Sequence, residues 1–281
     1  MKLSPFTPLH FSEANPSDGL PSRYVQTWAP TDQIMIQVVA ATADSAPTAT
    51  LYDACTDTAI GTITWNEWDI NSDTKVFFHI YQGLSEGYYK LTIADKTSDV
   101  FRVTSDELVL EKTTLIQYRN KDNKQRDDAA FVIDSVPYFF DFRVPGGFKD
   151  SGWQFGVNNE QFDTQFEDVV ELYAYEYTSK TLTMGGSIGV PVWYGDLLNR
   201  LLTCHFVYVN GERYSRSDTE SPQMNILVDG LDSFVFTQTL RRVVRIEADY
   251  ESLNQVAIRR VDNTNNRISD STNENVIILE I

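Results

Sequence analysis

Short apolar runs bounded by turn-forming residues recur through the first part of this chain. Runs of this length predict that this part folds as β-strands. The runs are rich in β-branched and aromatic side chains, and the clearest one alternates Tyr89, Leu91 and Ile93 with polar residues. The expected strands are 34–39, 49–54, 60–65, 76–81, 87–94 and 99–104. A spacing of about ten residues predicts an immunoglobulin-like β-sandwich over 33–105. The Cys–Trp–Cys spacing of antibody domains is absent, so only the architecture is predicted.

The rest of the chain, 106–281, is expected to form a second β-rich domain with one short helix. Its expected strands are 115–118, 171–177, 181–184, 204–209, 212–216, 233–239, 243–249, 256–261 and 276–281. We expect a turn at 178–180, a break at Gly146 and Gly147, and loops at 119–128 and 262–275. The fold class is therefore mainly β, with two domains in sequence.

Two local signals in this second domain are strong. Pro191 precedes Trp193, Leu197, Leu198, Leu201 and Leu202, which share one face of a 3.6-residue period and predict a helix of about ten residues. Asn210 and Gly211 lie between two alternating runs and predict a tight hairpin, because both turn positions need a positive φ.

The first 32 residues combine many prolines with large apolar side chains. Prolines at this density disfavour a helix or a central strand. We interpret 1–32 as an extended arm that docks on a neighbouring subunit, and an arm packed on its own domain is the equal alternative. The candidate assembly residues are Pro5, Phe6, Pro8, Leu9, His10 and Phe11.

A formal net charge of −17 bears on partners and compartment. Nucleic acid and anionic membrane surfaces are disfavoured, because both are bound through Lys and Arg. No run approaches the length of a membrane span, and 1–11 does not resemble a signal peptide, so synthesis in the cytoplasm is expected. In that reducing compartment Cys55 and Cys204 are expected to stay thiols.

No catalytic motif is found, and we expect neither an enzyme nor a cofactor. His79 and His205 lie inside predicted strands, and Cys204 next to His205 points to the opposite face of its strand. An acidic cluster beside aromatic residues leaves a glycoside hydrolase as a minor alternative. That cluster comprises Asp163, Glu167, Asp168 and Glu171.

Two binding alternatives also stay open. Asp69, Asn71 and Asp73 alternate as calcium ligands do, although an ordinary polar turn is favoured and no metal site is predicted. Trp65 and Trp68 are the best candidates for a sugar platform in a carbohydrate-binding or adhesin-type sandwich, although tryptophan in a sandwich is more often core.

Several short pieces spread over most of the chain carry a resemblance to a known group of proteins. They are SPFTPLHF (4–11), SDVFRV (98–103), the charged stretch 119–128, FRVPGGF (142–148), GVPVWYG (189–195), LNRLL (198–202) and NGERYSRS (210–217). They resemble uncharacterised tail-region proteins of tailed phages and prophages of gut anaerobic bacteria. The resemblance implies a virion structural protein of the tail tip or baseplate, assembled in the host cytoplasm, with other tail proteins and a homo-oligomeric ring as partners. It supplies no active site.

Overall fold

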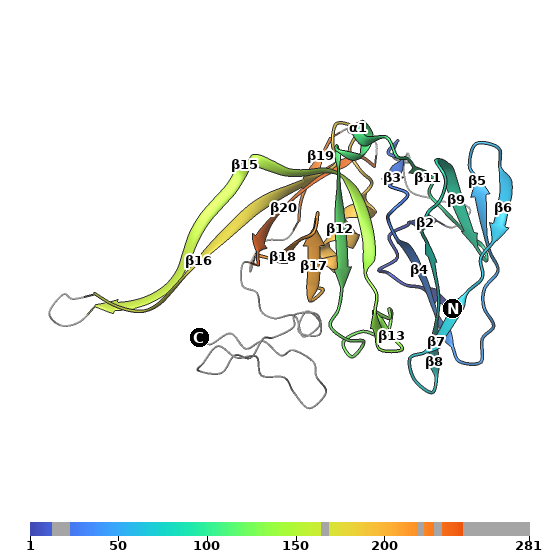
Figure 1. The fold of residues 1–281 in the computed structure, drawn as a ribbon, viewed down its shortest axis with the longest axis horizontal. Helices are drawn as coiled ribbons and strands as arrows, with labels where there is room; N and C mark the ends of the chain where they lie inside the picture. The colour runs from blue at the N-terminus through green and yellow to red at the C-terminus, as the bar shows by residue number, and fades with distance from the viewer. Residues whose placement is uncertain (13–22, 164–168, 218–221, 228–231, 244–281) are drawn as a thin grey trace, which may run out of the picture. The chain divides into compact units, whose positions relative to one another are not determined.

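The computed structural model describes residues 1–12, 23–163, 169–217, 222–227 and 232–243 (Figure 1). Residues Met1–Arg242 form one compact unit. The predicted fold class is confirmed: the described chain is mainly β, with a sandwich first and a second β-rich domain after it. The expected strands 256–261 and 276–281, and all but the first residue of 243–249, lie outside the described residues.

Two sheets form the sandwich. The first has the order β1 (Lys2–Leu3), β4 (Ile34–Ala41), β8 (Thr74–Tyr81) and β7 (Asn66–Asp69). The second has the order β2 (Phe11–Ser12), β10 (Lys96–Ser98), β9 (Gly87–Ile93), β11 (Phe101–Val103) and β3 (Gln26–Trp28), with β5 (Ala49–Asp53) and β6 (Thr58–Thr62) attached through β9. β3 pairs with β11 in parallel, and the other pairings in these two sheets are antiparallel.

The core of the sandwich comes from the inward faces of both sheets. Trp28, Leu91 and Phe101 are fully buried there. β4 is buried on both faces, because Ile34, Ile36 and Val38 belong to this core while Met35 belongs to the core of the second domain. A strand covered on two sides needs a continuous apolar run, which is what β4 has.

The second domain is a closed barrel. Its order is β15 (Phe140–Asp163), β12 (Thr113–Arg119), β17 (Phe206–Val209), β18 (Glu212–Arg216), β20 (Phe234–Arg242) and β16 (Val169–Met184), and β16 closes the ring by pairing with both β20 and β15. β19 (Gln223–Ile226) pairs with the first half of β20. The remaining described elements are a short hairpin of β13 (Val132–Ile133) and β14 (Val136–Pro137), the one-turn helix α1 (Glu107–Leu110) and the helix α2 (Val192–Leu201).

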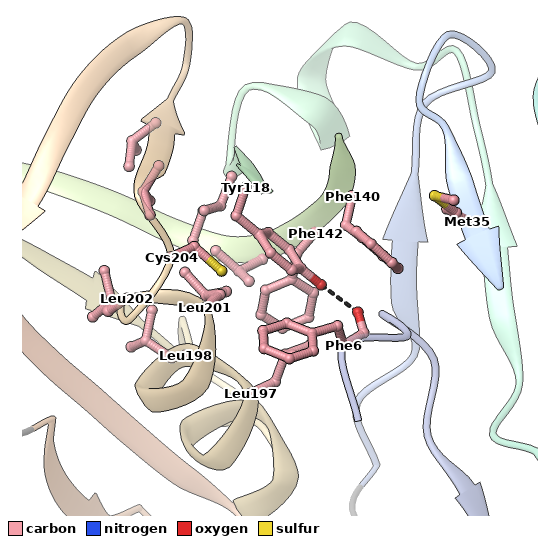
Figure 2. Packing of buried hydrophobic residues seen from close by; sticks show 14 of the residues in the cluster. Phe6, Met35, Tyr118, Phe140, Phe142, Leu197, Leu198, Leu201, Leu202 and Cys204 are labelled. Carbon is pink, nitrogen blue, oxygen red and sulfur yellow. Dashed lines mark hydrogen bonds between the residues drawn. The ribbon is translucent and has the colours of Figure 1, made fainter. Parts of the chain in front are cut away.

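The predicted helix is α2 (Val192–Leu201), which packs into the barrel core (Figure 2). Tyr194, Leu197, Leu198 and Leu201 are buried against inward-facing aromatic side chains such as Phe142 of β15. The helix approaches the barrel wall closely at Gly195, because any Cβ there would overlap the ring of Phe236. A helix of this length is held by such packing and not by its own propensity.

The N-terminal segment packs on its own chain, which was the second of the two alternatives. β1 and β2 pair with β4 and β10, so 1–12 contributes to both sheets of the sandwich. Phe6 is fully buried in the barrel core, where Tyr118 Oη donates a 2.5 Å hydrogen bond to its carbonyl oxygen (Figure 2). Residues 1–12 are apolar because they complete two cores, and they do not extend from the fold as a free arm; residues 13–22 of the predicted arm lie outside the described residues.

Buried polar contacts also join the sandwich to the barrel. The Arg143 guanidinium of β15 donates to both carboxylate oxygens of Asp32, at 2.6 and 2.8 Å. Asp141 accepts from the backbone N–H of Gln33 at 2.8 Å and from Gln117 Nε2 at 2.9 Å. These directional contacts fix how sandwich and barrel meet.

Candidate functional site

The most unusual feature of the described chain is a long hairpin made by the continuation of β15 and β16 beyond the barrel. β12 pairs with β15 only over 140–145, and β20 pairs with β16 only over 179–184. Over 153–163 and 169–178 the two strands pair only with each other among the described residues (Figure 1). A two-stranded ribbon is at best marginally stable in water. We call residues 152–162 and 169–178 the hairpin.

One face of the hairpin carries exposed apolar side chains on β15. Trp153, Phe155 and Val157 alternate along the strand, and 78% of the Phe155 side chain is exposed. Trp153 and Phe155 stack with ring centroids 5.9 Å apart. Opposite Trp153, Lys180 Nζ lies 4.0 Å from the centroid of the indole. Lys180 therefore covers part of this face at the base of the hairpin, and Phe155 further out is exposed to solvent.

The other face is also apolar. Tyr173 and Tyr175 of β16 stack at 5.5 Å and are exposed, and Phe162 faces Val170 across the hairpin. Tyr177, at the base, is covered by the Arg241 guanidinium at 4.4 Å. Its ring also lies against Gly156, where a Cβ would overlap it. Exposed apolar residues on both faces of one ribbon mark an interaction surface.

The hairpin carries no cation of its own. Between 152 and 178 the sequence has six carboxylates and no Lys or Arg, and the carboxylates are Glu160, Asp163, Glu167, Asp168, Glu171 and Glu176. Of the predicted acidic cluster, Asp163 is the last residue of β15 and Glu171 is exposed on β16, while Glu167 and Asp168 lie outside the described residues. The exposed position of Glu171 on a two-stranded ribbon differs from that of a carboxylate that flanks a scissile bond in a glycosidase cleft.

The six candidate assembly residues lie apart from the hairpin. Phe6, Pro8 and Leu9 are buried, Pro5 and Phe11 are half-buried, and His10 is exposed. His10 stacks on Trp193 of α2, with centroids 5.6 Å apart and planes 13° from parallel. Arg200 of α2 donates a 2.7 Å hydrogen bond to the carbonyl oxygen of Pro5. The structure uses these residues in internal packing.

The two candidate sugar-binding tryptophans form no open platform. Both are half-buried: Trp65 donates its indole N–H to the carbonyl oxygen of Pro47 at 2.7 Å, and Trp68 packs against the barrel core cluster. In the candidate calcium loop, Asn71 Oδ1 accepts from the backbone N–H groups of Asp73 and Thr74, at 2.9 Å each. The loop is an Asx-type turn that joins β7 to β8.

Cys204 and His205 precede β17, which begins at Phe206 and not at Cys204 as predicted, and the two residues differ in exposure. Cys204 is buried and His205 is exposed. Burial raises the pKa of the Cys204 thiol to about 12, which removes its nucleophilic thiolate at neutral pH. His79 is half-buried on β8, and its Nδ1 contacts the carbonyl oxygen of Thr64 at 3.0 Å. Neither histidine is arranged with a nucleophile.

A cleft of about 490 Å³ lies where sandwich and barrel meet. Its polar lining includes Asp32, Gln117, Asp141 and Arg143, and these groups are hydrogen-bonded to each other or to backbone. Burial raises the pKa of Asp141. These polar groups therefore serve structural contacts between sandwich and barrel.

Across the described parts of the chain, no three His, Cys, Asp or Glu side chains gather as a metal site. No described helix is long and apolar enough to cross a bilayer.

Comparison with known proteins identifies no family. No protein-family model and no curated protein matches the chain. A solved structure that it matches is the complex of Dpr2 Ig1-Ig2 with DIP-Theta Ig1-Ig3, at 10% identity over 85% of this chain and 91% of that one. The TM-score of that match is 0.17, a value too low to support any argument about this chain.

Proposed function

We propose that this chain is a non-enzymatic structural subunit of a phage tail, in the tail tip or baseplate, where it joins other tail proteins in a homo-oligomeric ring. The observation that carries the proposal is the hairpin, with Phe155 on one face and Tyr175 on the other exposed to solvent. An isolated ribbon of this kind is expected to be stabilised by a partner that covers it.

The size of the exposed surface is consistent with a stable contact. Five hairpin aromatics are between 41% and 78% exposed: Trp153, Phe155, Phe162, Tyr173 and Tyr175. Since an aromatic side chain buries about 150–250 Å² when fully covered, these five alone present roughly 500 Å². A specific interface buries about 800 Å² on each partner, so the hairpin supplies more than half of one side.

Two further features support a structural role. The large cleft has its polar groups engaged in joining sandwich to barrel, and the buried Cys204 is inert at neutral pH. The tail assignment itself comes from the resemblance in short pieces of sequence. A carbohydrate-binding role is less well supported, because Trp65 and Trp68 are both engaged in internal packing.

Particle composition tests this proposal. Phage particles from a host carrying the gene are purified, and the chain is sought by mass spectrometry and by immunogold labelling of tails. We expect the chain in tails at a fixed copy number per particle. We also expect that replacing residues 153–178 with an Asn-Gly turn leaves a folded chain that no longer enters particles. The proposal fails if purified particles lack the wild-type chain.

A further inference from the structure

The hairpin leaves the barrel at an irregular point of β15. β15 and β16 lose their register between Phe148 and Trp153, where residues 149–152 lie opposite Thr181 alone. β16 runs through this point as one strand. A bulge of this kind bends the strand that carries it. Pairing between β15 and β16 therefore does not by itself fix the direction in which the hairpin leaves the barrel.

One cation spans the bulge on the face that carries Trp153. Lys180 Nζ lies 4.0 Å from the centroid of the Trp153 indole and 5.4 Å from the centroid of the Phe148 ring. Phe148 packs on Tyr214 in the barrel, with ring centroids 4.8 Å apart. Lys180 Nζ also lies 3.7 Å from a carboxylate oxygen of Glu212 on β18. Lys180 therefore contacts both the hairpin beyond the bulge and the barrel before it.

A second cation contacts the opposite face of the hairpin. The Arg241 guanidinium of β20 lies 4.4 Å from the centroid of the Tyr177 ring on β16. In the amide orientation that satisfies both groups, the side-chain oxygen of Asn158 on β15 accepts hydrogen bonds from Arg241 at 3.1 and 3.3 Å. Arg241 itself pairs with Ser179, at the end of the stretch where β20 follows β16. One barrel side chain thus contacts both strands of the hairpin.

Resting on the proposed function, we infer that Lys180 and Arg241 are positioning residues that hold the hairpin in one orientation before a partner binds. Each makes a cation–π contact with the first hairpin aromatic on its face, and Phe155 and Tyr175 further out are left exposed. The segment 152–178 contains six carboxylates and no cation, so two cations at its base also attract it. A docking element that is already oriented loses less entropy on binding.

Double electron–electron resonance on the full chain measures the orientation of the hairpin as a distribution of distances between two spin labels. The labels are attached to Gln161→Cys on the hairpin and to Val192→Cys on α2, both at exposed positions. The chain also carries Cys55→Ser, which removes the exposed native thiol, while Cys204 is buried and stays unlabelled. Circular dichroism verifies that each labelled chain is folded.

The test variants are Lys180→Met and Arg241→Met, each of which removes a charge and keeps a long side chain. Lys180→Arg and Arg241→Lys keep the charge. Lys90→Met is the matched control, because Lys90 Nζ lies 5.8 Å from the ring centroid of Tyr52 in the sandwich, away from the hairpin. Lys180→Gln and Arg241→Gln replace any methionine variant that misfolds.

We expect a narrow distance distribution in the chain with labels alone. Each methionine variant should raise the fraction of chains outside that distribution at least about threefold, the factor that corresponds to the loss of one exposed cation–π contact. The charge-preserving variants and Lys90→Met should leave the distribution narrow.

The inference is overturned if the labelled parent is already as broad as the methionine variants, or if those variants leave the distribution unchanged. It is also overturned if Lys90→Met or a charge-preserving variant broadens the distribution as much as the methionine variants do. Each of these results concerns the isolated chain and overturns this inference alone. The absence of the chain from purified particles instead overturns the proposed function.

Discussion

The side-chain amide of Gln37 forms two hydrogen bonds with the backbone of Ala130. Gln37 Nε2 donates to the Ala130 carbonyl oxygen at 2.6 Å, and Gln37 Oε1 accepts from the Ala130 N–H at 3.0 Å. Gln37 belongs to β4 of the sandwich and is fully buried, while Ala130 precedes β13 next to the barrel core. The Gln37 amide thus pairs with the backbone of Ala130 as a neighbouring strand would, and this contact joins the two domains.

Replacing Gln37 with Leu is expected to lower the free energy of unfolding by about 2–4 kcal/mol, because two buried backbone groups lose their partners. Urea denaturation followed by fluorescence measures the change. Gln161→Leu, on the exposed hairpin, is the control and should change stability little. An equal effect of the two variants would contradict this account of Gln37.

The Asp32–Arg143 ion pair gives a second prediction. The Asp32 side chain is only 2% exposed, so removing either partner leaves a buried charge unpaired. Asp32→Leu and Arg143→Met alone should therefore each destabilise the fold by about 3–5 kcal/mol. The double variant Asp32→Leu, Arg143→Met should recover much of that loss, because no unpaired charge remains. Additive losses in the double-mutant cycle would argue against coupling of the two residues.

Phe6 allows a test of the N-terminal segment. Its ring is fully buried, contacts Phe131 edge-on at 5.2 Å and lies under the Arg126 guanidinium at 4.7 Å. Phe6→Ala should cost about 3–5 kcal/mol in thermal or urea unfolding. His10→Ala, at an exposed position on the same segment, should cost far less. Deleting 1–12 should prevent folding, whereas a folded, assembly-defective chain would restore the free-arm interpretation.

Local signals predicted much of this fold. The alternation of Tyr89 and Leu91 located β9, and Pro191 marked the start of α2. Asn210 and Gly211 both have positive φ, 49° and 82°, as their hairpin turn requires. Each of these features is decided by a few adjacent residues. Such features can therefore be predicted from one sequence.

The hairpin was missed because its determinants are distant or external. A turn was expected at 178–180, yet β16 continues through it, since Ser179 pairs with Arg241 of β20 some sixty residues later. Gly146 was expected to end a strand, yet β15 continues with φ at +104°, where a Cβ would overlap the Thr183 carbonyl oxygen of the neighbouring strand. The usual alternation rule also assumes that one face is polar. Phe155 and Tyr175 break it, because neither face is covered within the described chain.

Gly195 gives a prediction about the helix–barrel contact. An alanine Cβ at this position would overlap the Phe236 ring, so either α2 or the ring must move. Gly195→Ala should lower stability by about 1–3 kcal/mol, even though alanine favours a helix. Combining it with Phe236→Leu should reduce the additional cost of the alanine. Stabilisation by Gly195→Ala alone would show that the contact is looser than described.

The two cysteines should differ sharply in reactivity. Cys55 is exposed, whereas burial raises the pKa of the Cys204 thiol to about 12 from an ordinary value of 9.0. The folded chain therefore holds this proton more tightly than the unfolded chain does. That contribution to stability is complete below the unfolded pKa and is lost as pH rises from about 9 towards 12. With a thiol reagent at pH 8, we expect one rapidly reacting thiol per folded chain and two in denaturant. Cys55→Ser should abolish the rapid reaction, and rapid labelling of Cys204 in that folded variant would contradict its burial.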